Sequence, residues 1–488
     1  MSESRPAAVM ILAAGEGRRM KSRTPKVLHS LCGRSMLGHA LAASRELDPE
    51  RLVVVVGHGR DEVSAEVGRQ APEARVVVQE QQLGTGHAVR MVTEALGVLD
   101  GTVVVTYADM PLLRGETLRE LTFRHRAAGN AVTVLTAQGD PAGYGRIVRD
   151  AAGEFQRIVE EGDATPAELA IDEYNSGCYA FDGALLADAI KRVTTDNTQN
   201  QEYLTDVVEI VRRDGHPIGT MLAADAAEIQ GINDRVQLAA ARRALNDRIL
   251  DRLMRDGVTI NDPATTWVDV TVTIGQDAEI GPQTQLQGKT AIGSGARVGP
   301  GCLLEDTTIG DDAVVLNAVC RQAEIGPGAT VGPFAYLRPG ARVERGAHVG
   351  TYVELKNSVI GAGAKVPHLT YVGDAHIGER SNIGAGTIFA NYDGVAKHHT
   401  TVGHDAFIGS DTVLVAPLTV GDGAYTAAGS AITEDVPPGA LGIARGRQHN
   451  SGGWVERNRA GTRSAQAAAA ATRARAQAQH AHTDDPAE

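Results

Sequence analysis

TIGQDAEIGP, residues 273–282, and AIGSGARVGP, residues 291–300, contain the repeat that decides the fold of the second half of this chain. In each stretch an aliphatic residue recurs at every sixth position and is followed by Gly, and such pairs continue to Val420-Gly421. This period is typical of a parallel β-helix, in which each flat face holds one repeat and the aliphatic side chains point to the axis. Coils stacked about 4.8 Å apart bury those side chains in one continuous column.

Irregularities in the repeat mark candidate sites, because loops that leave a rigid scaffold often carry function. Three steps are one residue short: Leu304 to Ile309, Leu355 to Ile360 and Val372 to Ile377. The step from Ile388 to Val402 is fourteen residues instead of twelve. It predicts a small protruding loop around Asn391-Tyr392-Asp393-Gly394.

The chain is too long for a single hydrophobic core, since it has 488 residues and its repeat begins only after a long non-repetitive stretch. We expect an α/β domain over residues 1–233, a linker helix over 234–260 and a β-helix over 261–455. The Ala- and Arg-rich tail over 456–488 is expected to be disordered or a fraying helix.

The first 233 residues alternate short aliphatic runs, at 9–12, 52–56, 76–78 and 103–105, with helical patterns. Runs that are apolar on both faces predict a mostly parallel sheet covered by helices, with ligands beyond the strand C-termini. The linker is expected to be helical because Leu238, Leu245, Ile249 and Leu253 follow helical spacing. Asn233 or Asp234 can cap its start, and Gly257 can end it.

Composition narrows the function classes. A net charge of -13 argues against general nucleic-acid binding. The 4 cysteines are widely separated and form no CxxC, which favours a reducing cytoplasm. No stretch reaches the length of a membrane-spanning helix, and the apolar run at 7–14 is followed by charges that a signal peptide would not have. We therefore expect a cytoplasmic enzyme of small molecules, without nucleic acid or membrane partners.

A glycine-rich segment, LAAGEGRRM at residues 12–20, directly follows the first expected strand. Its glycines let backbone amides approach a phosphate, and Arg18 and Lys26 can neutralise the charge of a triphosphate. The spacing is neither GxGxxG nor that of a P-loop. The alternative of a generic glycine-rich turn with solvated arginines stays open on these residues alone.

This segment resembles the signature of sugar-nucleotide pyrophosphorylases, and QEQQLGTGHA at 79–88 resembles the uracil-reading loop of the uridyltransferases in that family. The resemblance implies that Arg18 and Lys26 are catalytic and that a sugar 1-phosphate attacks the α-phosphorus of UTP. It also implies the residues that bind UTP and N-acetylglucosamine 1-phosphate: Leu12, Ala13, Gly15, Lys26, Gln79, Gly84, Thr85, Gly145, Glu160, Asn175 and Asn233.

The same resemblance implies a Mg²⁺ site. Asp109, in the segment 107–111 after a buried strand, is the first ligand, and Asn233 in EIQGIND is the second. One carboxylate, one amide and phosphate oxygens suit Mg²⁺. For Asn233 the alternative is a helix N-cap. Two departures stand out: Ala108 replaces a common Gly and is expected to narrow the nucleotide pocket, and Gly162 replaces a common Lys.

Within the repeat, segments such as LRPGA (337–341), HLTYVGD (368–374), NIGAGT (382–387) and NYDG (391–394) are similar to the acetyltransferase half of the bifunctional glucosamine-1-phosphate acetyltransferase and N-acetylglucosamine-1-phosphate uridyltransferase family. The similarity runs from about Val9 to Trp454. It implies an α/β nucleotidyltransferase domain with a Rossmann-like, mostly parallel sheet, followed by a left-handed parallel β-helix of hexapeptide repeats. It also implies a homotrimer with shared acetyl-transfer sites.

The resemblance assigns residues to the second reaction as well. Those implied for glucosamine 1-phosphate are Arg338, Lys356, Tyr371 and Asn382, and those implied for acetyl-CoA are Ala385, Asn391, Tyr392, Ser410, Ala428 and Arg445. His368 is the implied general base, since an imidazole with the ordinary pKa of about 6.5 accepts a proton at cytoplasmic pH. Glu354 is a candidate to orient its ring. Asn391 and Tyr392, in the protruding loop, are expected to reach a neighbouring subunit.

Together these features predict an enzyme that makes UDP-N-acetylglucosamine for cell-envelope polysaccharides. A second hypothesis is a monofunctional nucleotidyltransferase whose β-helix is only structural or regulatory, although such a scaffold would not need His368, Lys356 and Arg338. A third is a zinc site between subunits at His399 and His404, for which the spacing supplies no third ligand.

Overall fold

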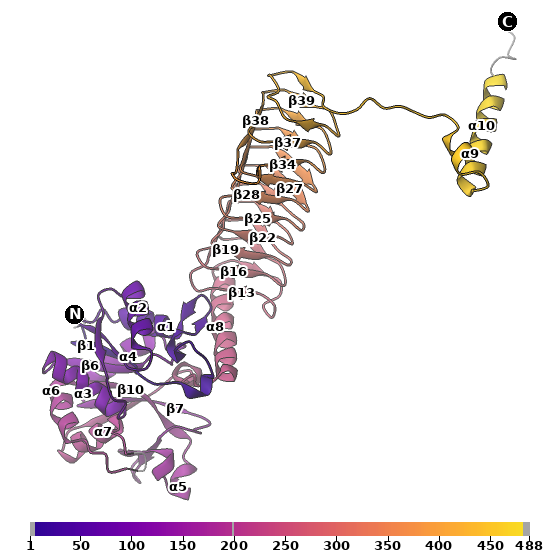
Figure 1. Cartoon of the computed structure of the whole chain (residues 1–488). Helices are drawn as coiled ribbons and strands as arrows, with labels where there is room; N and C mark the ends of the chain where they lie inside the picture. Colours follow the sequence, from indigo (N-terminus) through magenta and orange to yellow (C-terminus); the bar gives the residue numbers. More distant parts are fainter. Residues whose placement is uncertain (1–4, 198–199, 482–488) are drawn as a thin grey trace.

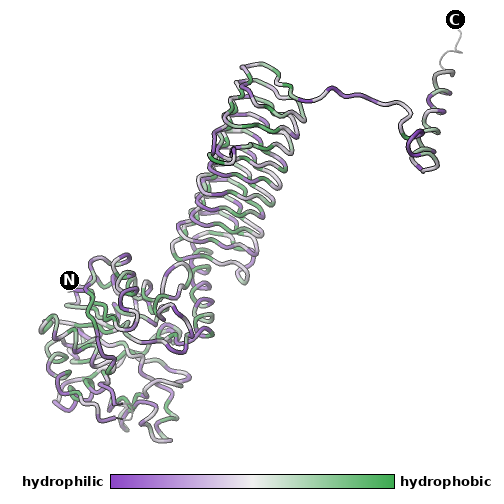
Figure 2. Tube along the Cα trace, viewed as in Figure 1, coloured by the Kyte–Doolittle hydropathy of each residue, from purple (hydrophilic) through white to green (hydrophobic). Residues whose placement is uncertain are grey.

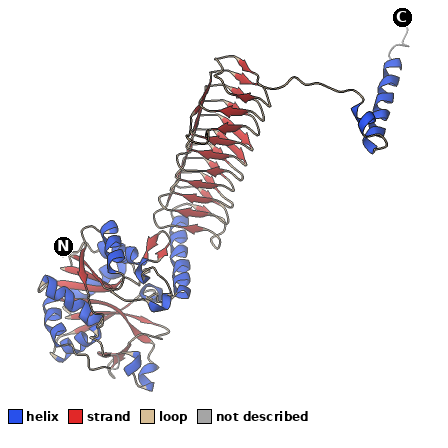
Figure 3. Cartoon of the chain, viewed as in Figure 1, coloured by secondary structure: helices blue, strands red, loops and turns tan. Residues whose placement is uncertain are grey.

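Two bodies of different architecture follow one another in this computed structural model, which describes residues 5–197 and 200–481. The first is a sheet with helices on both sides, and the second is a long prism of very short strands (Figures 1 and 3). Helix α8 (Arg235–Arg255) joins them, and helices α9 (Trp454–Asn458) and α10 (Arg463–Ala481) lie apart at the end of an extended segment.

The N-terminal sheet has the strand order β11-β7-β10-β6-β1-β4-β5, with a β8–β9 hairpin attached to β10. All neighbours along this order are parallel except β10, which runs antiparallel to β6 and β7. The predicted mostly parallel sheet is therefore confirmed. Its strands are β1 (Ala8–Ala13), β4 (Leu52–Val56), β5 (Arg75–Val78), β6 (Thr102–Tyr107), β7 (Val132–Gln138), β8 (Arg146–Arg149), β9 (Phe155–Val159), β10 (Glu173–Asp182) and β11 (Ile218–Leu222).

Strand β1 is central because its side chains are buried on both faces. Val9 and Ile11 pack into one hydrophobic cluster, and Met10 and Leu12 pack into another. Alternation along a strand sends neighbouring side chains to opposite faces, so a fully apolar run needs helices on both sides. Those helices are α1 (Met36–Arg45), α2 (Arg60–Gln70), α3 (Thr85–Leu96), α4 (Gly115–Ala127), α6 (Gly183–Ala189) and α7 (Leu204–Arg213); the short α5 (Pro166–Leu169) lies beside β8.

The prism is the predicted β-helix: three parallel sheets of 11, 10 and 9 short strands that the chain visits in turn. The first sheet runs from β12 (Thr259–Ile260) to β41 (Leu441–Gly442), the second from β13 (Trp267–Val268) to β40 (Ala431–Ile432), and the third from β14 (Thr273–Ile274) to β38 (Leu418–Val420). Ile280, Val298 and Val315 pair in register and are buried. Apolar and polar residues alternate along every coil (Figure 2).

The predicted register is wrong at one coil. In β34 (Ile388–Ala390) it is Phe389 that is fully buried, whereas Ile388 is exposed. Ile383 pairs with Ile408 across this coil, a separation of 25 residues, whereas Lys365 pairs with Asn382 one coil earlier, a separation of 17. The insertion before β35 (Thr400–Val402) is therefore larger than the repeat suggested. Apolar residues occupy both positions, and only packing on the neighbouring coils decides which one points inward.

Helix α8 begins at Asp234, whose side chain accepts a hydrogen bond from Gln237 N. Asp234 is thus the cap, and Asn233 is not. The tail was expected to be either disordered or helical, and the structure has a helix over Arg463–Ala481. This agrees with the high helix propensity of its alanines. No helix among the described residues is both long and apolar enough to cross a membrane.

Candidate active sites

Two adjoining cavities lie at the C-terminal ends of the parallel strands in the N-terminal body. The first has a volume of about 550 Å³ and is lined by predicted nucleotide residues: Leu12, Ala13, Gly15, Arg18, Lys26, Gln79, Gly84 and Thr85. The second, of about 390 Å³, is lined by Gly145, Glu160, Asn175 and Asn233. Thr85, Tyr107 and Asp109 line both. The structure therefore brings the predicted uridyltransferase residues into one continuous hollow.

The chain enters the first cavity from the end of β1. A tight turn at Gly17, with φ of 65°, leads into the short helices η1 (Arg18–Met20) and η2 (Lys26–Leu28). A Cβ at Gly17 would lie 2.5 Å from Lys26 Cβ, so only glycine lets the two segments approach this closely. Arg18 is mostly exposed and pairs with Glu16 at 2.6 Å on the rim of the cavity.

Lys26 links the two predicted metal ligands. Its Nζ lies 2.5 Å from Asp109 Oδ2 and 3.0 Å from Asn233 Oδ1. A carboxylate and an amide oxygen, carried by segments far apart in sequence, thus already converge on one cation. Among the described residues no group of three or more His, Cys, Asp or Glu could hold a metal. This donor set fits Mg²⁺, which takes oxygen ligands and completes its shell with phosphates and water.

The sugar-side cavity contains a partly desolvated carboxylate. Burial raises the pKa of Glu160, against the opposing effect of a hydrogen bond from Thr205 at 3.3 Å. Asn175 is buried, donates to Tyr179 Oη at 2.7 Å and accepts from Gly177 N at 3.0 Å. These bonds fix the orientation of its amide at the cavity wall.

The expected uracil loop is held by hydrogen bonds to a later segment. Gly86 N donates to Glu202 O at 2.8 Å, and Leu204 N donates to Thr85 Oγ1 at 3.1 Å. Gln79 uses its amide nitrogen within the loop, toward Gly84 O at 3.0 Å. Ala108, expected to narrow the nucleotide pocket, lines neither cavity: it is fully buried in the core on one side of the sheet, so that expectation is wrong.

On the β-helix, His368 ends strand β30 (Lys365–His368) at one edge of the prism and is exposed. The predicted coenzyme A residues continue along the same edge on successive coils: Gly386 N donates to His368 O, Asp411 N to Ala385 O, and Gly429 N to Ser410 O. A Cβ at Gly409 would lie 2.5 Å from Ala428 N, so glycine keeps these coils close. His368, Ala385, Ser410 and Ala428 thus form one column, and Arg445 follows it in the extended segment after β41.

A cluster of cations lies on the second sheet of the prism, at the C-terminal ends of its strands. Lys356, in β28 (Glu354–Lys356), pairs with Asp374 at 2.9 Å. Lys397, from the inserted loop, lies against Lys356, and this contact and the like charge lower the pKa of the Lys397 amine. The same contact and the Asp374 carboxylate raise the pKa of Lys356. Arg338 adds a third cation nearby. Such a cluster suits a phosphate, whose charge favours protonation of all three.

Asp374 and Lys397 were not among the residues predicted from the sequence. Asp374 accepts hydrogen bonds from Lys356, Asn357 and Asn391, which makes it the centre of the cluster. Its position at the end of HLTYVGD was the one available signal. Nothing in the hexapeptide pattern singles out Lys397, because the folding of the loop alone brings it to Lys356.

Two expectations for this half need correction. Glu354 accepts from Arg338 at 3.0 Å, so its carboxylate is engaged there and not with the His368 ring. Asn391 does not project from the loop: it is 6% exposed and donates to Asp374 at 2.6 Å, whereas Tyr392 is exposed. The zinc alternative, for which the spacing supplied no third ligand, gains no support among the described residues: His404 Nδ1 accepts from Glu379 N, and no metal-binding group includes it.

Asn382 lies apart from the other residues implied for glucosamine 1-phosphate. It begins β33 (Asn382–Ile383) on the first sheet, between Lys365 and Phe407. Lys356 and Tyr371 belong to the second sheet, where Asn391 Nδ2 lies 3.4 Å from Tyr371 Oη. Asn382 and the other residues implied for glucosamine 1-phosphate therefore face different sides of a single prism.

Comparison with known proteins extends to almost the whole chain. A family model for the MobA-like NTP transferase domain matches residues 9–228. A bifunctional protein GlmU from Streptomyces avermitilis is 62% identical over 471 residues, which cover 96% of this chain and 98% of that protein. Those from Thermobifida fusca and Streptomyces coelicolor are 61% and 60% identical, each again covering 96% of this chain and 98% of the relative. The match to a solved UDP-glucose pyrophosphorylase complexed with UDP-glucose covers 50% of this chain and 100% of that structure's chain, at 14% identity and with a TM-score of 0.41.

Sequence identity above 50% to the GlmU relatives extends through both the nucleotidyltransferase body and the β-helix. The chain therefore belongs to the bifunctional GlmU family, the acetyltransferase and uridyltransferase family that its motifs resemble.

Proposed function

We propose that this chain acetylates glucosamine 1-phosphate with acetyl-CoA on its β-helix and then transfers UMP from UTP to the product in its N-terminal body. The products are UDP-N-acetylglucosamine and pyrophosphate. The observation that carries this proposal is that identity to bifunctional relatives spans both bodies, each of which presents its own site. A cytoplasmic location suits this chemistry, because both nucleotide substrates are made there.

In uridyl transfer, the protein acts by positioning and charge. Gly15 and Gly17 let backbone amides approach the triphosphate, and Lys26 and Arg18 offset the negative charge that gathers on the phosphates. Asp109 and Asn233 would hold Mg²⁺, which supplies further charge neutralisation when bound. Glu160 and Asn175 line the cavity proposed for the sugar. An oxygen of the sugar 1-phosphate attacks the α-phosphorus, and pyrophosphate leaves without a covalent enzyme intermediate.

In acetyl transfer, the neutral amine nitrogen of glucosamine 1-phosphate attacks the thioester carbonyl while His368 takes a proton from that nitrogen. The C–S bond then breaks, and the coenzyme A thiolate leaves. Arg338, Lys356 and Lys397 bind the phosphate of the sugar. Ala385, Ser410 and Ala428, in the column that starts at His368, lie where the coenzyme A chain would extend along the prism, and Arg445 is placed to contact its phosphates.

A homotrimer completes the acetyl-transfer site in this proposal. Support comes from the placement of Asn382 and Lys356 on different sheets, since a second prism is needed to bring both to one substrate. Exposed apolar side chains also stack along the prism edges: Phe334 on Tyr352, and Phe407 on Tyr425, each with ring centroids 5.4 Å apart. Exposed apolar ridges of this kind favour association with other chains.

Two assays on one purified chain test the proposal: pyrophosphate release from UTP with N-acetylglucosamine 1-phosphate, and thiol release from acetyl-CoA with glucosamine 1-phosphate. His368→Ala is expected to abolish thiol release and leave pyrophosphate release unchanged. The matched control is His376→Ala, an exposed histidine on the third sheet, which should alter neither activity. Undiminished thiol release in His368→Ala would remove this residue as the base. No thiol release by the unmodified trimer would favour a structural β-helix.

A further inference from the structure

Helix α8 is built into the β-helix on one side. Asn246 is fully buried, donates to Thr266 O at 2.8 Å and accepts from Val268 N at 3.0 Å. Leu250 and Leu253 join the same hydrophobic core as the first coils. These contacts fix the rotation and height of the helix relative to the prism, so α8 behaves as a rigid part of the β-helix and not as a flexible linker.

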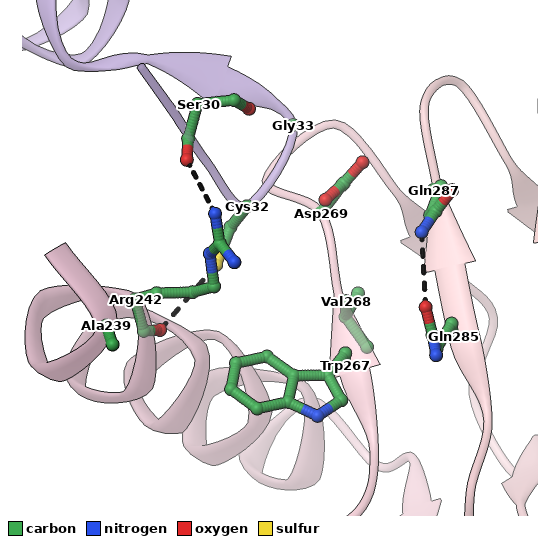
Figure 4. Close-up of a pocket in the computed structure, with 10 residues that line it drawn as sticks. All are labelled: Ser30, Cys32, Gly33, Ala239, Arg242, Trp267, Val268, Asp269, Gln285 and Gln287. Carbon is green, nitrogen blue, oxygen red and sulfur yellow. Dashed lines mark hydrogen bonds between the residues drawn. The ribbon is translucent and has the colours of Figure 1, made fainter. Parts of the chain in front are cut away.

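On its other side the helix touches the nucleotidyltransferase body through three arginines. Arg235 donates to Met20 O at 3.3 Å and Arg242 to Ser30 O at 2.9 Å. Figure 4 shows the second contact at a cavity of about 590 Å³, between α8, the first coil and the turn that holds Cys32. The third contact is made by Arg248.

Arg248 joins two segments that are remote in sequence. Its Nη1 donates to Leu112 O at 2.8 Å, and its Nη2 donates to Asp225 Oδ2 at 2.8 Å. Leu112 lies three residues after Asp109. The Asp225 side chain also caps the short helix η5 (Ala226–Ile229), which leads directly into the segment that ends at Asn233.

The two segments are also joined directly, since Ile232 N donates to Asp109 O at 2.9 Å. A guanidinium presents its donors in a planar, fixed arrangement. Its two contacts therefore set the separation of the Leu112 and Asp225 segments, and with it the approach of the Asp109 and Asn233 oxygen atoms.

We propose that Arg248 is a positioning residue for uridyl transfer, which holds the Asp109 and Asn233 segments at the separation that the metal requires. This inference rests on the metal pair in the proposed function. It also gives α8 a role in uridyl transfer, because the coil that anchors Asn246 keeps Arg248 in place.

Hydrogen exchange in the metal-free full-length protein tests the positioning directly. Arg248→Ala is expected to speed amide exchange in residues 107–113 and 225–233 and to leave the β-helix unchanged. The matched control is Arg255→Ala, on the same helix, which removes an arginine with an ion pair to Asp251 at 2.7 Å but touches neither segment. Equal exchange in the two variants would overturn the proposal.

Kinetics of the same proteins separate positioning from general damage. Arg248→Ala should raise the Mg²⁺ concentration for half-maximal uridyl transfer about tenfold, as outer contacts to metal ligands typically do, without altering acetyl transfer. Arg248→Lys should recover part of this loss, since one ammonium can serve one of the two acceptors. An unchanged Mg²⁺ dependence in Arg248→Ala would refute the role. An unchanged dependence in Asp109→Asn would instead refute the metal pair itself, and the exchange result would still decide whether Arg248 holds the two segments.

Discussion

Gly17→Ala should disable uridyl transfer while leaving acetyl transfer intact. The new Cβ would lie 2.5 Å from Lys26 Cβ, whereas an ordinary contact needs at least 3.4 Å, so one of the two segments must move by about 1 Å. Lys26 Cβ is fixed by the backbone and cannot swing aside as a side-chain tip would. Whichever segment moves, Lys26 Nζ changes its position relative to the glycine-rich turn that is proposed to hold the triphosphate.

A misplacement of about 1 Å at a catalytic group costs about 100-fold in rate. We expect kcat/KM for pyrophosphate release to fall by about that factor in Gly17→Ala. The backbone at Gly17 has φ of 65°, so alanine also brings a conformational cost of about 1–2 kcal/mol to stability.

Gly129→Ala is the matched control, because Gly129 has φ of 62° but no atom within 4 Å of a new Cβ. It carries the same backbone cost without the collision. The melting temperatures of the two variants should be similar, and both should release thiol from acetyl-CoA at the normal rate. If Gly17→Ala keeps a kcat/KM within about threefold of Gly129→Ala, the close approach to Lys26 does not matter for catalysis and the reasoning is refuted.

Three further predictions concern the core, the coenzyme A edge and pH. Phe389→Ala removes a fully buried ring and should lower the free energy of unfolding by about 3–5 kcal/mol, measured by denaturant titration; a loss below about 1 kcal/mol would place the ring outside the core. Gly409→Ala forces Ala428 N away and should raise the KM for acetyl-CoA about tenfold with normal uridyl transfer, and an unchanged KM would remove this edge from the coenzyme A site. Burial and the charge of Glu209 raise the pKa of Asp206 to about 6. The pKa of an aspartate in the unfolded chain is about 3.9, so the ionisation of Asp206 has no effect on stability below that pH and destabilises the fold fully above the folded-state pKa. Asp206→Asn should therefore raise the free energy of unfolding at pH 8 by about 1 kcal/mol after solvent screening, measured by denaturant titration, and the gain should vanish at about pH 4; a gain that is the same at both pH values would contradict the shift.

Local pattern was sufficient for much of this protein. The pairs Ile274-Gly275 and Ile280-Gly281 predicted the β-helix, because a period of six fits one flat face and one inward side chain. The glycine-rich segment at 12–20 predicted a phosphate site for an equally local reason, since backbone amides and glycine turns act within a few residues. The role of His368 came from a resemblance, and it remains a prediction.

Sequence pattern failed where two choices were locally equal. Ile388 and Phe389 are both apolar, and the neighbouring coils select Phe389 for the interior. Asn391 was expected to point outward, but Asp374 offers it a buried acceptor. Asn233 and Asp234 could each cap α8, and the proximity of Lys26 assigns Asn233 to the cavity.

By itself, the sequence determined the architecture through its repeat period, and it indicated the two reactions through motifs that resemble a known family, since both are properties of adjacent residues. Only the tertiary structure decided which distant groups meet: Lys397 against Lys356, Lys26 between Asp109 and Asn233, and Arg248 on Leu112. Each of these contacts joins different loops or coils. Their geometry depends on coil lengths and on the packing of α8 between two bodies, which no local pattern encodes.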